Sequence, residues 1–210
     1  MRELSPVDLP LRKSLEAPNK TIDFIYFIES GFASVVANGP DGVNIEVGLI
    51  GGEGMTGLAV VLGANRSTNA TYIQMAGKGL RMSASGLRAA LEKSASLKKT
   101  LLQYCYLFMV QASQTALANG HGLLEERLAR WLLMAQDRVN SSKLTLTHEF
   151  LAIMLGVRRT GVTAVIGVLE RKGLVRASRG AITILNRKGL EKVAGGRYGV
   201  PEAEFTRLFG

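Results

Sequence analysis

The first third of the chain shows the hydrophobic pattern of short β-strands. Runs rich in β-branched and aromatic residues alternate with glycine-containing turns, and the Asn-Gly and Asp-Gly pairs within residues 38–42 are typical of a hairpin. From Val43 to Ile50 apolar positions alternate with Asn44, Glu46 and Gly48. The predicted strands are residues 22–27, 32–37, 43–50, 71–75 and 79–82. Short strands joined by glycine-rich turns predict an antiparallel roll or barrel.

After Ser83 the spacing becomes helical, with a short helix over 87–91 and a long one starting at Leu97. The long helix has a stripe of residues that recur every three or four positions: Leu97, Leu101, Tyr104, Phe108, Gln111 and Thr115. Its other faces are also apolar, so we expect a second copy of the chain to cover this stripe as a dimer interface. Glycines within residues 119–122 are expected to interrupt the helix at a hinge, before another helix over 123–138.

The remaining pattern predicts two short helices followed by a hairpin. Thr147 is a good helix N-cap, and Gly156 supplies the left-handed residue that commonly ends a helix. The second helix has an apolar face of Val162, Val165, Ile166 and Leu169. Its opposite face is polar and cationic, with Arg159, Thr160, Thr163 and Arg171. With a hairpin over 174–185 and an arginine at its tip, this is the pattern of a winged helix-turn-helix. A small helical packing domain with a solvated basic face is the alternative.

The charge balance favours an anionic partner. The chain has 210 residues and a formal charge of +9, from 26 Lys and Arg against 17 Asp and Glu. Cationic residues cluster beyond position 155, which favours nucleic acid or another anionic surface over an evenly solvated basic surface. Cys105 is the single cysteine, so cysteine-based zinc sites, four-thiolate iron–sulfur clusters and disulfide frameworks are excluded. The amino end has no apolar signal segment, and the longest apolar stretch is too short to span a bilayer, so a cytoplasmic protein is expected.

The stretch GGEGMTG, residues 51–57, raises the alternative of an enzyme. Gly52, Gly54 and Gly57 have the G-x-G-x-x-G spacing of a dinucleotide-binding turn. That turn requires a parallel strand–helix–strand unit and an acidic residue about 20 positions on. The apolar run 58–62 is too short for the helix, and Ala76 to Gly79 contain no carboxylate. We therefore expect the glycines to shape a turn of the roll, with no catalytic group and no cofactor.

Three segments resemble the Crp/Fnr family of bacterial transcription regulators. They are LTLTHEFLAIMLGVRRTGVTAVIGVLERKGLVRASRGAITIL, RLARWLLMAQDR and IYFIESGFASVVA. The resemblance implies an α+β protein with a cyclic-nucleotide-binding-like roll over 1–95, a dimerisation helix and hinge over 96–121, and a winged helix-turn-helix over 122–210. It also implies a homodimer on an inverted-repeat operator, with RNA polymerase as a partner. A nonspecific nucleic-acid-binding protein is the other alternative.

The resemblance assigns roles on the DNA side residue by residue. Arg159 stands at the family's base-reading position, where an arginine can bond a guanine bidentately. Thr160 and Ala164 depart from the glutamate and arginine that are frequent at the next reading positions, so the operator sequence stays open. Thr147, His148, Arg158 and Arg179 stand at phosphate-contacting positions. The DNA-binding set is completed by Thr163 on the recognition helix and Ser178 in the wing turn.

On the sensor side, the resemblance implies an effector pocket. Gly52 and Glu53 match the pair that binds a ribose hydroxyl in nucleotide-binding members, and Arg66 and Ser67 are candidates for the phosphate turn. Alignment through the following strand instead puts Ala70 in the arginine's place, and a buried phosphate without a cation is costly. We therefore expect an effector other than cyclic AMP, or none. Relatives usually have more residues before the first strand than the roughly twenty found here, which leaves open whether the roll is complete.

Overall fold

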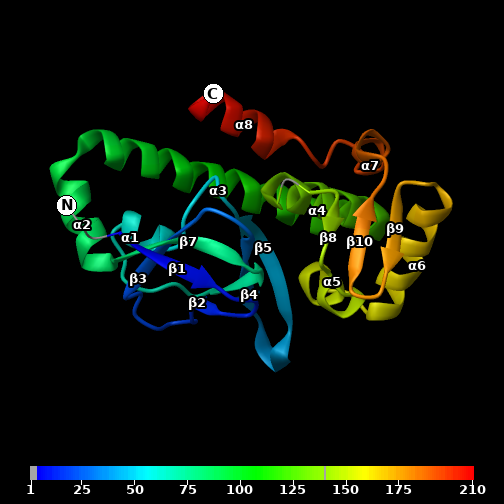
Figure 1. Cartoon of the computed structure of the whole chain (residues 1–210), viewed down its shortest axis with the longest axis horizontal. Helices are drawn as coiled ribbons and strands as arrows, with labels where there is room; N and C mark the ends of the chain where they lie inside the picture. Colours follow the sequence, from blue (N-terminus) through cyan, green and yellow to red (C-terminus); the bar gives the residue numbers. More distant parts are fainter. Residues whose placement is uncertain (1–3, 140) are drawn as a thin grey trace. The chain divides into compact units, whose positions relative to one another are not determined.

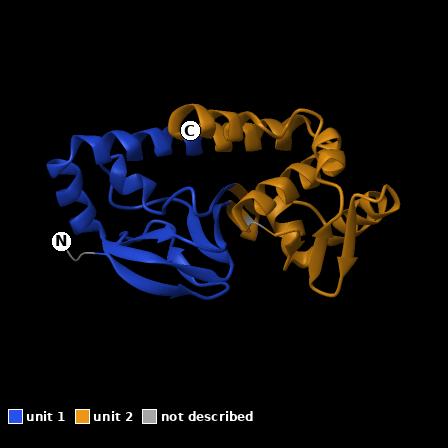
Figure 2. Ribbon diagram, turned by 45° about the horizontal axis from the view of Figure 1, so that its top comes forward, with its two compact units in different colours: residues 1–38, 48–109 blue, residues 39–47, 110–210 orange. Residues whose placement is uncertain are grey.

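The computed structural model describes residues 4–139 and 141–210, and the chain divides into two compact units. Unit 1 consists of residues 1–38 and 48–109, and unit 2 of residues 39–47 and 110–210 (Figure 2). The short segment 39–47 therefore lies in the same unit as the C-terminal half of the chain, although it is part of a hairpin whose strands continue into unit 1.

Unit 1 is built on two antiparallel sheets. The strands are β1 (Ser5–Leu9), β2 (Ser14–Glu16), β3 (Phe24–Ile28), β4 (Phe32–Asn38), β5 (Asn44–Ile50), β6 (Ala70–Met75) and β7 (Gly77–Ser83). One sheet has the order β1-β7-β3 and the other β2-β6-β4-β5 (Figure 1). Leu9, Ile25, Phe32, Leu49 and Ile73 are fully buried and form the core of the roll. The predicted antiparallel roll is confirmed.

Two strands of this unit were absent from the prediction. Most residues of β1 and β2 are neither β-branched nor aromatic, the types that mark a strand: Ser5, Pro6, Asp8, Ser14 and Glu16. Both are edge strands held by pairing to β7 and β6. A 3₁₀ turn, η1 (Pro40–Gly42), joins β4 to β5, and the four-residue helix α1 (Leu58–Val61) follows the glycine-rich stretch.

Helices α2 (Ala84–Lys93) and α3 (Ala95–His121) follow the last strand of the roll. Ser83 caps α2 by accepting a hydrogen bond from the N–H of Gly86 at 3.0 Å. α3 has 27 residues and continues through Gly120, so the predicted interruption begins later than expected, at Gly122. Among the described residues, no single helix is long and apolar enough to cross a membrane; the helices His148–Leu155 and Arg159–Arg171 reach that length and apolarity only as a bent pair.

The C-terminal part of unit 2 combines helices with a small sheet. Its elements are α4 (Leu124–Val139), β8 (Lys143–Leu144), α5 (His148–Leu155), α6 (Arg159–Arg171), β9 (Val175–Ser178), β10 (Ala181–Ile184), α7 (Arg187–Val193) and α8 (Val200–Phe209). The sheet order is β8-β10-β9, and β9 packs beside α6 (Figure 1). Leu128, Leu132, Leu151, Val162 and Ile182 are fully buried between these elements. The predicted two helices and hairpin are confirmed, while α7 and α8 extend the unit beyond them.

Candidate functional site

Helices α5 and α6 form a helix-turn-helix. Thr147 caps α5, since its hydroxyl accepts a hydrogen bond from the N–H of Phe150 at 3.1 Å. Gly156 ends the helix at φ 61° and ψ 40°, a left-handed conformation that glycine adopts without strain. Arg158 is the N-cap of α6, and the two helices differ in direction by 109°. This is the angle at which the first helix supports the second in a helix-turn-helix.

The first turns of α6 present polar and cationic side chains to solvent. Val162, Ile166 and Leu169 are buried and fix one face of the helix against the domain core. The outward residues are Arg158, Arg159, Thr160, Thr163 and Ala164, all of which are exposed. Because the N-terminal turns of a recognition helix reach base edges in the major groove, Arg159 lies at a position suited to reading a base.

The N-terminus of α5 is tied to this surface. His148 Nδ1 lies 2.9 Å from Thr163 Oγ1, so the first residue of α5 is hydrogen-bonded to the second turn of α6. His148 is half-buried, whereas Thr147 beside it is exposed. Thr147 and His148, two of the predicted phosphate-contacting residues, therefore lie next to the exposed N-terminal turns of α6.

The hairpin β9–β10 forms the wing. Ser178 and Arg179 lie at its turn and are exposed. The start of the wing is fixed to α6, because the N–H of Ala177 donates to Glu170 Oε1 at 2.7 Å. Residues 122–210 contain 15 of the 26 Lys and Arg and 8 of the 17 Asp and Glu, which gives this segment +7 of the total charge of +9.

Comparison with known proteins identifies this arrangement. Residues 126–193 match the model of the Crp-like helix-turn-helix domain. The transcriptional regulator SdrP of Thermus thermophilus is 38% identical over 80 residues, which cover 35% of this chain and 40% of the length of SdrP. The structure of FixK2 from Bradyrhizobium japonicum superposes with a TM-score of 0.77 at 16% identity, over 90% of this chain and 96% of FixK2. A transcriptional regulator of the CRP family from Thermus thermophilus superposes with a TM-score of 0.72 at 21% identity, over 90% of this chain and 97% of that one.

The C-terminal part of the chain is therefore a Crp-like helix-turn-helix domain, and the chain has the fold of Crp/Fnr regulators. This fold bears on the question raised by the glycine-rich stretch, because it is not built from the parallel strand–helix–strand unit of a dinucleotide-binding enzyme. The geometry gives the physical reason. α1 has four residues, and the registers of β2 and β4 with β6 are antiparallel, so the parallel unit that a dinucleotide turn needs is not formed at these strands.

Two of the glycines in this stretch serve packing within the roll. A Cβ atom on Gly54 would lie 2.0 Å from the ring of Tyr104, so the side chain of α3 rests directly on the glycine backbone. Gly57 has φ 78°, and a Cβ there would lie 2.1 Å from Ile25 Cδ1. Gly52, in contrast, is exposed and would place a Cβ in ordinary contact only.

The four candidate effector residues occupy two turns of the roll. Glu53 is half-buried in the turn after β5, whereas Arg66 is exposed before β6. The hydroxyl of Ser67 accepts a hydrogen bond from the N–H of Asn69 at 3.0 Å, so it stabilises its own turn. Ala70 begins β6.

Sequence reasoning missed the buried carboxylate of this region. Glu16 Oε1 accepts a hydrogen bond from the N–H of Gly57 at 2.5 Å, and its Oε2 accepts one from the hydroxyl of Thr71 at 3.3 Å. Burial raises the pKa of Glu16, and the two hydrogen bonds oppose that shift. A lone glutamate in a polar segment carries no local signal of burial, because both partners lie more than 40 residues away in the chain.

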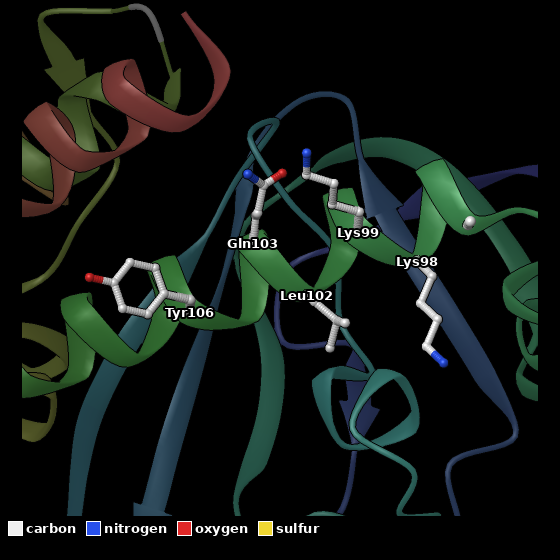
Figure 3. Close-up of a pocket in the computed structure, with 6 residues that line it drawn as sticks. Lys98, Lys99, Leu102, Gln103 and Tyr106 are labelled. Carbon is white, nitrogen blue, oxygen red and sulfur yellow. The ribbon is translucent and has the colours of Figure 1, made fainter.

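The long helix α3 presents a different face from the predicted stripe. Leu101, Tyr104 and Gln111 are buried within the chain itself, while Leu97, Phe108 and Thr115 are half-buried. The exposed apolar residues of α3 are Leu102, Tyr106, Met109 and Leu117. Lys98, Lys99, Leu102, Gln103 and Tyr106 line a shallow hollow of about 470 Å³ along the first half of this helix (Figure 3).

Proposed function

We propose that this Crp/Fnr chain is a sequence-specific regulator that binds an inverted-repeat DNA operator as a homodimer. The observation that carries the proposal is the exposed N-terminal half of α6, where Arg158, Arg159 and Thr163 project beside a wing with Arg179 at its tip. Arg159 would read a base and Thr147, His148, Arg158 and Arg179 would contact phosphates. In a symmetric dimer two such helices enter major grooves roughly 34 Å apart, so the operator should have two inverted half-sites.

The dimer interface that we propose runs along the exposed face of α3. Leu102, Tyr106, Met109 and Leu117 are spaced by four, three and eight residues, which places them along one side of a helix. The hollow at Leu102 and Tyr106 is lined mostly by apolar surface, which a partner helix would remove from water. The predicted stripe is less suitable, because Leu101 and Tyr104 already pack inside their own unit.

The sensor side supports an effector other than cyclic AMP. Ala70 begins the strand where a phosphate-binding cation would be required, and Arg66 is exposed. The carboxyl group of Glu16 already occupies the N–H of Gly57, so this donor is not free to bind a phosphate. Calorimetric titration with cyclic AMP should give no saturable heat; binding abolished by Arg66→Ala would show that the Arg66 register is the correct one.

Selection of bound duplexes from a random pool tests the DNA-binding proposal. The wild-type protein should enrich one inverted-repeat sequence, and it should bind that sequence at least about 10³-fold more tightly than a scrambled duplex of equal length. A ratio near one would instead identify a nonspecific nucleic-acid-binding protein. Enrichment of a single unrepeated site would contradict the homodimer.

A further inference from the structure

Strand β5 brings two residues of the β4–β5 hairpin into the unit that contains the helix-turn-helix. Residues 39–47 belong to unit 2, so Ile45 and Glu46 lie in the same compact unit as α4, α5 and α6 (Figure 2). Glu46 is only 4% exposed, although the alternation of the strand places it among the polar positions. Val43, the apolar residue directly before β5, is 64% exposed.

Glu46 is bonded to the only tryptophan of the chain. The indole Nε1 of Trp131, on α4, donates to Glu46 Oε1 at 2.6 Å, and both side chains are buried. The ring of Trp131 in turn packs edge-on against Phe150 of α5, with centroids 5.7 Å apart. Phe150 is the residue whose N–H is capped by Thr147. The carboxylate therefore contacts, through one side chain, the first turn of the helix that supports the recognition helix.

A buried cation lies near Glu46 in the same unit. Arg130 is buried next to Trp131 in the chain, and its guanidinium is attracted electrostatically by Glu202 and, to a smaller extent, by Glu46. Arg130 also donates to the backbone oxygen of Arg197 at 3.0 Å and to Thr115 Oγ1 at 3.2 Å. A buried carboxylate that is hydrogen-bonded and near a buried cation is held in a defined geometry, since any displacement exposes uncompensated charge.

Ile45 makes a second contact, at the turn of the helix-turn-helix. Its Cδ1 lies 3.2 Å from the point where a Cβ on Gly156 would stand. Gly156 is the residue whose left-handed conformation sets the angle between α5 and α6. The side chain of Ile45 thus packs against one side of the turn, while Arg127 of α4 donates to the last carbonyl of α5, that of Leu155.

From these contacts we infer that Ile45 and Glu46 are positioning residues for DNA reading: they hold α5 and the Gly156 turn, so that the base-reading side chain of α6 is presented in one orientation. The inference rests on the proposed DNA binding. Base contacts depend on precise geometry, whereas phosphate contacts depend mainly on charge. Loosening the turn should therefore reduce discrimination between sequences more than it reduces binding to DNA in general.

Five variants of the full-length chain separate this role from a merely structural one. Ile45→Ala removes the cover over Gly156, and Glu46→Ala removes the acceptor of the indole N–H. Glu46→Gln keeps an oxygen acceptor of the same shape and should rescue the contact. Val43→Ala is the matched control, since it truncates an exposed side chain of the same hairpin, directly before β5. Ile45→Val keeps the test available if Ile45→Ala fails to fold.

The first readout is the ratio of affinities for the selected operator and a scrambled duplex. Ile45→Ala and Glu46→Ala should lower this ratio about tenfold or more, the loss expected for one misplaced base contact, with little change on the scrambled duplex. Glu46→Gln and Val43→Ala should keep the wild-type ratio. An unchanged ratio in folded Ile45→Ala and Glu46→Ala protein overturns the inference.

The second readout needs no DNA and so remains decisive if the proposed function fails. Amides of residues 148–157 should exchange faster with deuterium in Ile45→Ala and Glu46→Ala than in Val43→Ala, because α5 and its turn lose their fixed contacts. The emission of Trp131 should change in Glu46→Ala and return in Glu46→Gln. Unchanged exchange over 148–157 would show that the two residues do not hold the turn, whatever the protein binds.

Discussion

Replacing Arg159 and Arg179 by alanine separates reading from positioning on the proposed DNA surface. Arg159 is the first residue of α6 and is exposed, so its truncation removes the proposed base contact without opening the core. A bidentate arginine–guanine pair contributes about 1–3 kcal/mol of discrimination, which corresponds to a loss of about 5- to 150-fold for each half-site of the cognate operator. The same variant should lose much less on a scrambled duplex, where no base is read.

Arg179→Ala should behave differently, because Arg179 lies at the wing turn, where a flexible cation meets phosphate. Each lost phosphate contact lowers the slope of log K against log salt by about 0.9, or by about 1.8 for a dimer, and weakens all sequences alike. Fluorescence anisotropy with cognate and scrambled duplexes over a salt series measures both effects. Arg171→Ala is the control for net charge, since Arg171 is an exposed cation in the last turn of α6, the helix that begins at Arg159. If Arg159→Ala weakened both duplexes equally, the base-reading role would be refuted.

Three further predictions follow from the packing of α3. Met109→Glu should shift the protein toward monomer in sedimentation at micromolar concentration, because it places a charge in the proposed apolar interface; Thr100→Glu, exposed on the other side of the helix, should not. Gly54→Ala should lower stability to urea by about 1–3 kcal/mol, because the new Cβ collides with the ring of Tyr104, whereas Gly52→Ala should be nearly neutral. Burial raises the pKa of Cys105 from 9.0 to about 11, so the thiol stabilises the fold below pH 9 and this contribution is lost as the pH rises toward 11. Urea unfolding of Cys105→Ala should lack that part of the pH dependence, and an identical profile in both proteins would contradict it.

The helix-turn-helix was predictable because its determinants are local. The cap at Thr147, the left-handed Gly156 and the apolar face of Val162 and Ile166 lie within 20 residues of one another. The exposure of Arg158 and Arg159 follows once that face is buried. In contrast, β1 and β2 owe their strand conformation to pairing with distant strands, and their own residues carry little strand propensity.

The face of a helix or strand that points inward was harder to predict than the element itself. α3 is apolar on several sides, so spacing alone could not tell that Tyr104 packs on Gly54 while Tyr106 faces outward. The strand over 43–50 was placed correctly, but Val43 is exposed and Glu46 is buried, the reverse of what their polarity indicates. Periodicity locates the two faces of an element; the partner that covers each face comes from elsewhere in the chain.

The two buried glutamates show what decides such cases. A carboxylate is stable in the interior only where hydrogen-bond donors or cations surround it. Here the donors come from distant positions in the chain: Gly57 is 41 residues from Glu16, and Trp131 is 85 residues from Glu46. Such groups therefore mark places where separate segments must come together in one geometry, because neither partner is stable in the interior alone. In the roll this place is the glycine-rich turn at Gly57, and in unit 2 it is the contact of Glu46 with Trp131, which packs on α5. The side chains that would touch DNA lie on α6 and the wing. Ile45 and Glu46 lie outside both elements, and their proposed effect on base reading would act through Gly156 and Trp131.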